Sequence, residues 1–157
     1  MTRIFSLAAF VLTLAACGSI EPLPGQYAIT SATVGVDTCE LGGEADIEEE
    51  VITLAIDEDA VTVSIGDSDG VTFDCEMDKS DLVCEEVVQT QDAGGDDGDA
   101  MLTLAWSLGG TFADESTLDP GELSLNYSCE GADCDLFAAD AEITLPCQTA
   151  FTITAAQ

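Results

Sequence analysis

Residues 51–84 read VITLAIDEDAVTVSIGDSDGVTFDCEMDKSDLVC, and this stretch decides the fold of the chain. Apolar residues recur at every second position in each of its four segments, which is the pattern of strands with one buried face. Short turn-like sequences separate the segments at 57–60, 66–70 and 79–80. Folding the chain about these turns brings the apolar residues of neighbouring segments together on one face. The stretch therefore predicts three consecutive antiparallel hairpins.

The turns also fix which residues lie opposite one another. They set Ile56 against Val61, Val63 against Phe73, and Cys75 against Cys84. A slip of one residue would turn every side chain of a strand to the wrong face, so the register is tightly specified. The two cysteines fall in a non-hydrogen-bonded pair, where Cα atoms approach to about 4.5 Å, a distance that a disulfide can span. We therefore predict a disulfide between Cys75 and Cys84.

The rest of the chain continues the strand pattern more loosely. We predict a first strand over 26–36, further strands over 102–108 and 123–129, and a last strand over 151–154. Asp119-Pro120-Gly121 is a turn sequence, because proline presets φ and glycine accepts a positive φ; 92–99 is a predicted loop, and 135–141 is the only candidate for a short helix.

These segments predict an all-β fold, an antiparallel meander of about eight strands closed into an up-and-down barrel. The alternative is an immunoglobulin-like β-sandwich, to which Trp106 between cysteines points.

The first 18 residues, MTRIFSLAAFVLTLAACG, are typical of a secretory signal peptide. Arg3 precedes an apolar run that is too short to span a bilayer and that ends in small residues. Leu14-Ala15-Ala16-Cys17 resembles the lipobox of bacterial lipoproteins. The resemblance implies cleavage before Cys17 and attachment of a diacylglyceryl group to that cysteine. The alternative is a plain signal peptide with a cysteine placed there by chance.

The chain then divides into three parts. Residues 1–16 are the expected lipoprotein signal peptide, 17–25 the lipidated cysteine with a short tether, and 26–157 a single β domain. The resemblance implies a place in the cell envelope and a membrane contact through lipid at Cys17. Gly18 is not the aspartate that retains such proteins at the inner membrane of enteric bacteria, so we expect the outer membrane.

The charge balance excludes whole classes of partner. The chain has 32 acidic and 2 basic residues, a net charge of −30, and removal of the signal would leave Lys79 as its single basic side chain. Nucleic-acid binding and a polybasic membrane patch both need positive charge and are excluded. Copies of such a chain repel one another, so we expect a monomer. The surface is interpreted either as a solvated coat or as a site for divalent cations.

The six cysteines after Cys17 form an even set. In an exported chain such a set predicts three disulfides. The sequence leaves the pairing of four of them open: Cys39, Cys129, Cys134 and Cys147. A zinc site is disfavoured, because the chain has no histidine and no paired CxxC spacing. We expect neither metal nor cofactor.

Catalytic machinery is missing from the sequence. Without histidine, a Ser-His-Asp or Cys-His arrangement cannot be built. Neither GxGxxG nor GxxxxGK[ST] occurs, and Lys79 lies at a predicted hairpin tip. We therefore expect a protein that is not an enzyme.

Pro24-Gly25-Gln26-Tyr27, at the start of the first strand, resembles the Gly-x-Trp opening of the lipocalins, with Tyr27 in the tryptophan position. The basic residue that packs over this aromatic in lipocalins has no counterpart near the end of the chain. The resemblance implies a barrel that holds a small apolar ligand. Its candidate lining residues are Ile52, Leu54, Val61, Val63, Phe73 and Trp106.

Two alternatives to a hollow barrel stay open. Eight strands also permit a barrel that its own side chains fill. The protein would then be a surface interaction or structural lipoprotein, whose acidic face binds divalent cations or a basic partner.

Overall fold

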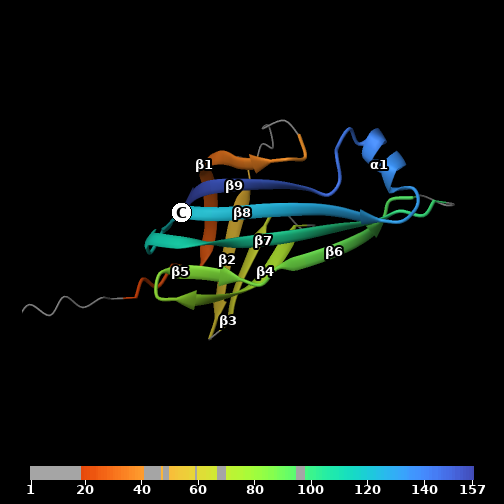
Figure 1. Cartoon of the computed structure of the whole chain (residues 1–157). Helices are drawn as coiled ribbons and strands as arrows, with labels where there is room; N and C mark the ends of the chain where they lie inside the picture. The colour runs from red at the N-terminus through yellow and green to blue at the C-terminus, as the bar shows by residue number, and fades with distance from the viewer. Residues whose placement is uncertain (1–18, 41–46, 48–49, 59, 67–69, 95–97) are drawn as a thin grey trace, which may run out of the picture.

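The structure, a computed structural model, describes residues 19–40, 47, 50–58, 60–66, 70–94 and 98–157. Its elements in this part of the chain, shown in Figure 1, are β1 (Gly25–Asp37), β2 (Val51–Asp57), β3 (Ala60–Ile65), β4 (Val71–Asp78), β5 (Asp81–Cys84), β6 (Val87–Asp92), β7 (Met101–Asp114), β8 (Thr117–Glu130), α1 (Cys134–Asp140) and β9 (Cys147–Ala156). The expected signal peptide and Cys17 lie outside the described residues.

The strands form one antiparallel sheet in the order β5-β4-β3-β2-β1-β9-β8-β7-β6. Because β5 also pairs with β7, eight strands close into a ring, and β6 continues along the edge of β7 beyond β5. The predicted all-β meander and barrel are confirmed. The immunoglobulin-like sandwich would need two sheets, whereas the described strands belong to one.

The hairpins between β2 and β5 have the predicted register. Ile56 lies opposite Val61, and Val63 lies opposite Phe73. Cys75 and Cys84 are directly opposite, with their Cα atoms 3.9 Å apart, and form a disulfide. The alternation of apolar residues therefore determined both the pairing and the face.

The turn expected at Asp119-Pro120-Gly121 is wrong. These residues lie inside β8, and the β7–β8 hairpin reverses at Glu115-Ser116 instead. The register of β8 against β9 shifts between Leu118 and Gly121, which marks a bulge. Proline donates no hydrogen bond, and a bulge is a place in a strand where that loss is tolerated. The short helix is found one residue earlier than expected, over Cys134–Asp140.

Two ends of the barrel can be distinguished (Figure 1). The closed end carries the β2–β3, β4–β5 and β7–β8 turns together with Gln157 and the tether at Leu23. The open end lies opposite, where β2 and β4 begin and where α1 follows β8. Strand β1 pairs with β2 only over Gly25–Ala28, so the part of β1 nearer the open end does not pair with β2.

Tyr27 plugs the closed end. Its side chain is 2 % exposed, and its ring meets that of Phe112 edge-on, with centroids 5.9 Å apart. The Tyr27 hydroxyl donates to the carbonyl oxygen of Leu23 at 2.6 Å and lies 3.2 Å from that of Glu115. Burial and, after it, the negative charge of Asp114 raise the pKa of Tyr27, so the hydroxyl keeps its proton.

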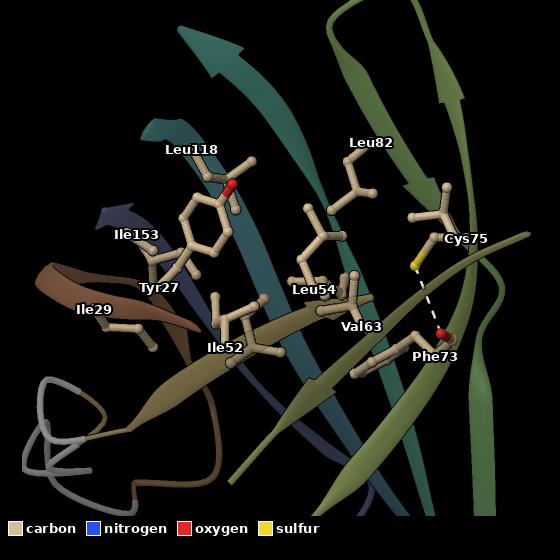
Figure 2. Close-up of a cluster of buried hydrophobic side chains, with 14 of the residues drawn as sticks. Tyr27, Ile29, Ile52, Leu54, Val63, Phe73, Cys75, Leu82, Leu118 and Ile153 are labelled. Atoms are coloured by element: carbon tan, nitrogen blue, oxygen red, sulfur yellow. Dashed lines mark hydrogen bonds between the residues drawn. The ribbon is translucent and has the colours of Figure 1, made fainter. Parts of the chain in front are cut away.

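Buried side chains from both walls of the ring meet behind this plug. Figure 2 shows Tyr27, Leu118 and Ile153 at one side of the cluster and Val63, Phe73 and Cys75 at the other. Val63 and Phe73 are fully buried. The described residues of the ring therefore share one apolar core.

Two glycines make room for this core on the inner wall. Gly110 and Gly121 lie opposite each other on β7 and β8. A Cβ on Gly121 would lie 2.8 Å from Cγ1 of Ile153, closer than Cβ atoms approach other atoms, and 3.0 Å from Cδ2 of Leu118, which is a tight contact. Large side chains thus pack directly on the backbone at this point.

Two further disulfides complete the predicted set of three. Cys39–Cys147 joins the chain after β1 to the start of β9 and spans 108 residues, with its Cα atoms 4.9 Å apart. Cys129–Cys134 joins β8 to α1 across a separation of 5 residues. These are the four cysteines whose pairing the sequence left open.

We expect Gly121→Ala to lower the free energy of unfolding by about 1–3 kcal/mol, because the added methyl group overpacks the core at Ile153 and Leu118. Gly35→Ala is the matched control, since a Cβ there meets only the carbonyl oxygen of Ala150 at 3.7 Å. Urea unfolding followed by circular dichroism measures both. Equal losses in the two variants would contradict the close packing at Gly121.

We expect removal of Cys39–Cys147 to destabilise the protein more than removal of Cys129–Cys134. The first disulfide closes a far longer loop, and the chain-entropy relation gives a difference of about 2–3 kcal/mol. Double cysteine-to-alanine variants, compared by urea unfolding, provide the measurement. A larger loss for the Cys129–Cys134 variant would contradict the expectation.

Candidate functional site

Five of the six residues predicted to line a ligand cavity belong to the packed core. Ile52, Leu54, Val61, Val63 and Phe73 are each at most 8 % exposed and lie in one cluster. The sixth, Trp106, is partly buried and packs against the edge of that cluster. The structure thus brings all six together, five as core and Trp106 at its boundary.

Beyond the core, the inner wall continues toward the open end in rows that cross neighbouring strands. One row runs Val87, Trp106, Leu125 and Thr149 over β6, β7, β8 and β9. The next row outward contains Gln89, Leu104, Tyr127 and Cys147. Buried Leu102, Leu108 and Leu123 share the alternation of these rows and identify their face as the inner one.

Four neighbouring side chains of these rows are half-buried: Leu104, Trp106, Leu125 and Tyr127. We call this set the open face. It stays partly exposed because β6 to β9 extend past the part of the ring where β2, β3 and β4 pair with their neighbours. An apolar wall on two long strands is therefore left without full cover at the open end.

The polar groups of the open face are uncharged. The indole Nε1–H of Trp106 is buried and has no acceptor in the described part of the protein. A buried donor without a partner costs about 1–3 kcal/mol. Burial raises the pKa of the Tyr127 phenol, so that side chain is neutral at physiological pH. The face can offer apolar contact and the phenol, but no ionic interaction.

One acidic group lies at the end of the tryptophan row. Asp37 of β1 faces Thr149, whose hydroxyl donates to Asp37 Oδ1 at 3.3 Å. Thr149 is 7 % exposed, and it is the one polar residue that is buried among the described residues. The row that contains Trp106 therefore ends at Asp37 on β1. The charged group next to the row is negative rather than positive.

Acidic side chains are numerous, but those in the described part of the chain do not form a metal-binding cluster. In the described residues no group of three or more histidine, cysteine or acidic side chains is arranged to hold a metal ion. Three acid-rich loops, at 57–59, 67–70 and 96–99, lie partly outside the described residues, since 59, 67–69 and 96–97 are not described. Among the helices that are described, none has the length and apolar character to cross a membrane.

Sequence reasoning found Trp106 but missed the three neighbours that make up the rest of the open face. The alternation over 102–108 and 123–129 placed each of them on an apolar strand face. Their pairing was hidden, because a turn centred on Pro120 sets a different register from the reversal found at Glu115-Ser116. Comparison of the chain with protein families, with curated proteins and with solved structures finds no match.

We expect Trp106→Phe to leave the free energy of unfolding within about 1 kcal/mol of the wild type, because the loss of apolar area is offset by removal of the unpaired N–H. Phe73→Ala, at a fully buried position, is the reference and should cost about 3–5 kcal/mol. Urea unfolding measures both. A loss above about 2 kcal/mol for Trp106→Phe would mean that the indole N–H has a partner.

Proposed function

We propose that this protein is a lipid-anchored, non-enzymatic binding protein of a bacterial cell envelope, and that it holds a small, uncharged, apolar ligand on the open face. The observation that carries the proposal is the cluster of half-buried apolar side chains on the inner wall, above a packed core. Ligand sites combine apolar walls with a few neutral polar groups, and the open face has this composition.

The ligand lies above the core rather than in the centre of the barrel. Val63 and Phe73 fill the space that a central cavity would need, and both are fully buried. Trp106 remains in the proposed site, because it sits where the packed core ends. The residues that replace the other predicted lining residues are Leu104, Leu125 and Tyr127.

The charge distribution supports an uncharged ligand. The net charge of −30 repels anions, and Lys79 lies on the β4–β5 turn at the closed end. Among the described residues, a carboxylate or phosphate would therefore find no cation near the open face. The half-buried apolar walls equally disfavour a polar cation, which would lose its hydration there.

The place in the envelope is supported by the lipobox-like residues before Cys17 and by the three disulfides. Disulfides persist in oxidising compartments such as the bacterial periplasm or the cell surface. A lipid at Cys17 would hold the domain at a membrane of that compartment, which we propose to be the outer one.

Binding can be tested with N-phenyl-1-naphthylamine, an uncharged apolar fluorophore that accepts excitation energy from tryptophan. Because Trp106 is the single tryptophan of the chain, energy transfer from it reports binding of the probe, and substitutions on and off the open face locate the site. We expect Leu125→Ala to raise the Kd of the probe by about tenfold, since a lost apolar contact of about 1.4 kcal/mol has that effect.

The matched control is Leu136→Ala, which truncates a leucine that is 65 % exposed on α1. We expect it to bind the probe as the wild type does. An absence of energy transfer in the wild type, or equal Kd values in the two variants, would refute the proposed site.

A further inference from the structure

We propose that the closed end of the barrel is the membrane-facing surface of this protein, so that the open face points away from the bilayer. The inference rests on the proposed lipidation of Cys17 and goes beyond it, because lipidation alone does not say which end of the domain meets the lipid.

Hydrogen bonds fix the tether to the closed end from Leu23 onward. The Leu23 N–H donates to the carbonyl oxygen of Glu115 at 2.8 Å, and its own carbonyl oxygen accepts from the Tyr27 hydroxyl at 2.6 Å. The side-chain amide of Gln157 donates to the Leu23 and Pro24 carbonyl oxygens at 3.3 and 3.2 Å. The tether is therefore held between the β7–β8 turn and the last residue of the chain.

The chain before Leu23 follows the same end of the barrel. Ser19, Ile20 and Glu21 line one surface hollow together with Ala113–Ser116 at the β7–β8 turn. Ile20 is partly buried and packs against the core cluster. The described tether thus approaches the domain beside the hairpin turn, not along the barrel wall.

Chain length then limits where the lipid can lie. Cys17 precedes Leu23 by six residues, so its Cα atom lies within about 20 Å of the hydrogen-bonded Leu23 even when the chain is fully stretched. Leu102, at the far end of the inner wall, is twelve residues from Asp114 along β7, or about 40 Å of strand. A strand tilt of about 40° leaves roughly 30 Å along the barrel axis. The anchor is too short to place the open end at the bilayer.

The acidic side chains around the tether add no attraction to anionic lipid at the closed end. Glu21, Asp114 and Glu115 lie around the tether, and anionic headgroups repel them. We therefore expect retention on anionic vesicles to increase with salt, which screens this repulsion over about 10 Å at 0.1 M. The partner surface is a bilayer that holds the acyl chains, without recognition of headgroup charge.

Depth-dependent fluorescence quenching tests the orientation. The full lipidated chain is reconstituted in phosphatidylcholine vesicles that carry brominated or spin-labelled lipids. Three proteins are compared: the wild type with Trp106, a Trp106→Phe/Glu115→Trp variant at the closed end, and a Trp106→Phe/Leu136→Trp variant on α1. Glu115 is exposed and contributes to the hydrogen bonding of Leu23 only through its backbone, and Leu136 is 65 % exposed, so both positions accept tryptophan.

We expect loss of emission for Glu115→Trp and no loss for the wild type or for Leu136→Trp. Quenching of Leu136→Trp, or equal quenching of all three proteins, would overturn the orientation while leaving lipidation intact. Vesicle flotation and the mass of the N-terminal peptide are measured on the same samples. Protein that does not float and carries an unmodified Cys17 would overturn the proposed lipidation and the orientation together.

Discussion

Closure of the ring through the pairing of β5 with β7 is the constraint on which the rest of the structure depends. It consists of three residue pairs, Asp81 with Thr111, Leu82 with Gly110, and Val83 with Gly109. Glycine is suited to this seam, because a Cβ on Gly109 would lie only 3.3 Å from the carbonyl oxygen of Leu82. On its other edge β5 is held by β4 through Cys75–Cys84. Without this seam, β5 and the part of β7 that pairs with it would be free edges, and the two walls would not enclose one core.

The shortness of the same seam creates the open face. After Glu85, whose N–H still donates to the carbonyl oxygen of Asp74 on β4, the chain leaves β4 and continues along β7 as β6. Beyond this point the ring is no longer closed by β5. The inner residues of β7 and β8 keep their apolar alternation there but lose the opposite wall that buries their neighbours. Core and proposed site are thus one continuous inner surface, and they differ in whether the ring is closed around them.

The parts of the fold that short turns determine could be predicted from the sequence, and the parts that distant pairings determine could not. The partners of Ile56, Val63 and Cys75 could be predicted because the turns have only two to five residues. Such short turns leave one register that keeps every apolar residue inside. The turn predicted at Pro120 was wrong because proline is found in β-bulges as well as in turns. The partners of Cys39 and Cys129 depend on how β1, β8 and α1 approach in space, which local pattern does not contain.

The disulfide between Cys39 and Cys147 has a mechanical consequence. A pull between the N-terminal tether and the C-terminus would first separate β1 from β9, whose outer ends, Ala28 and Ala156, are paired. Separation of the strands would stop at the Cys39–Cys147 disulfide. The applied force is then transmitted through this bond and bypasses the 108-residue span between the two cysteines. Tension applied at the termini would therefore be confined to the first and last strands, and β2 to β8 would carry none of it directly.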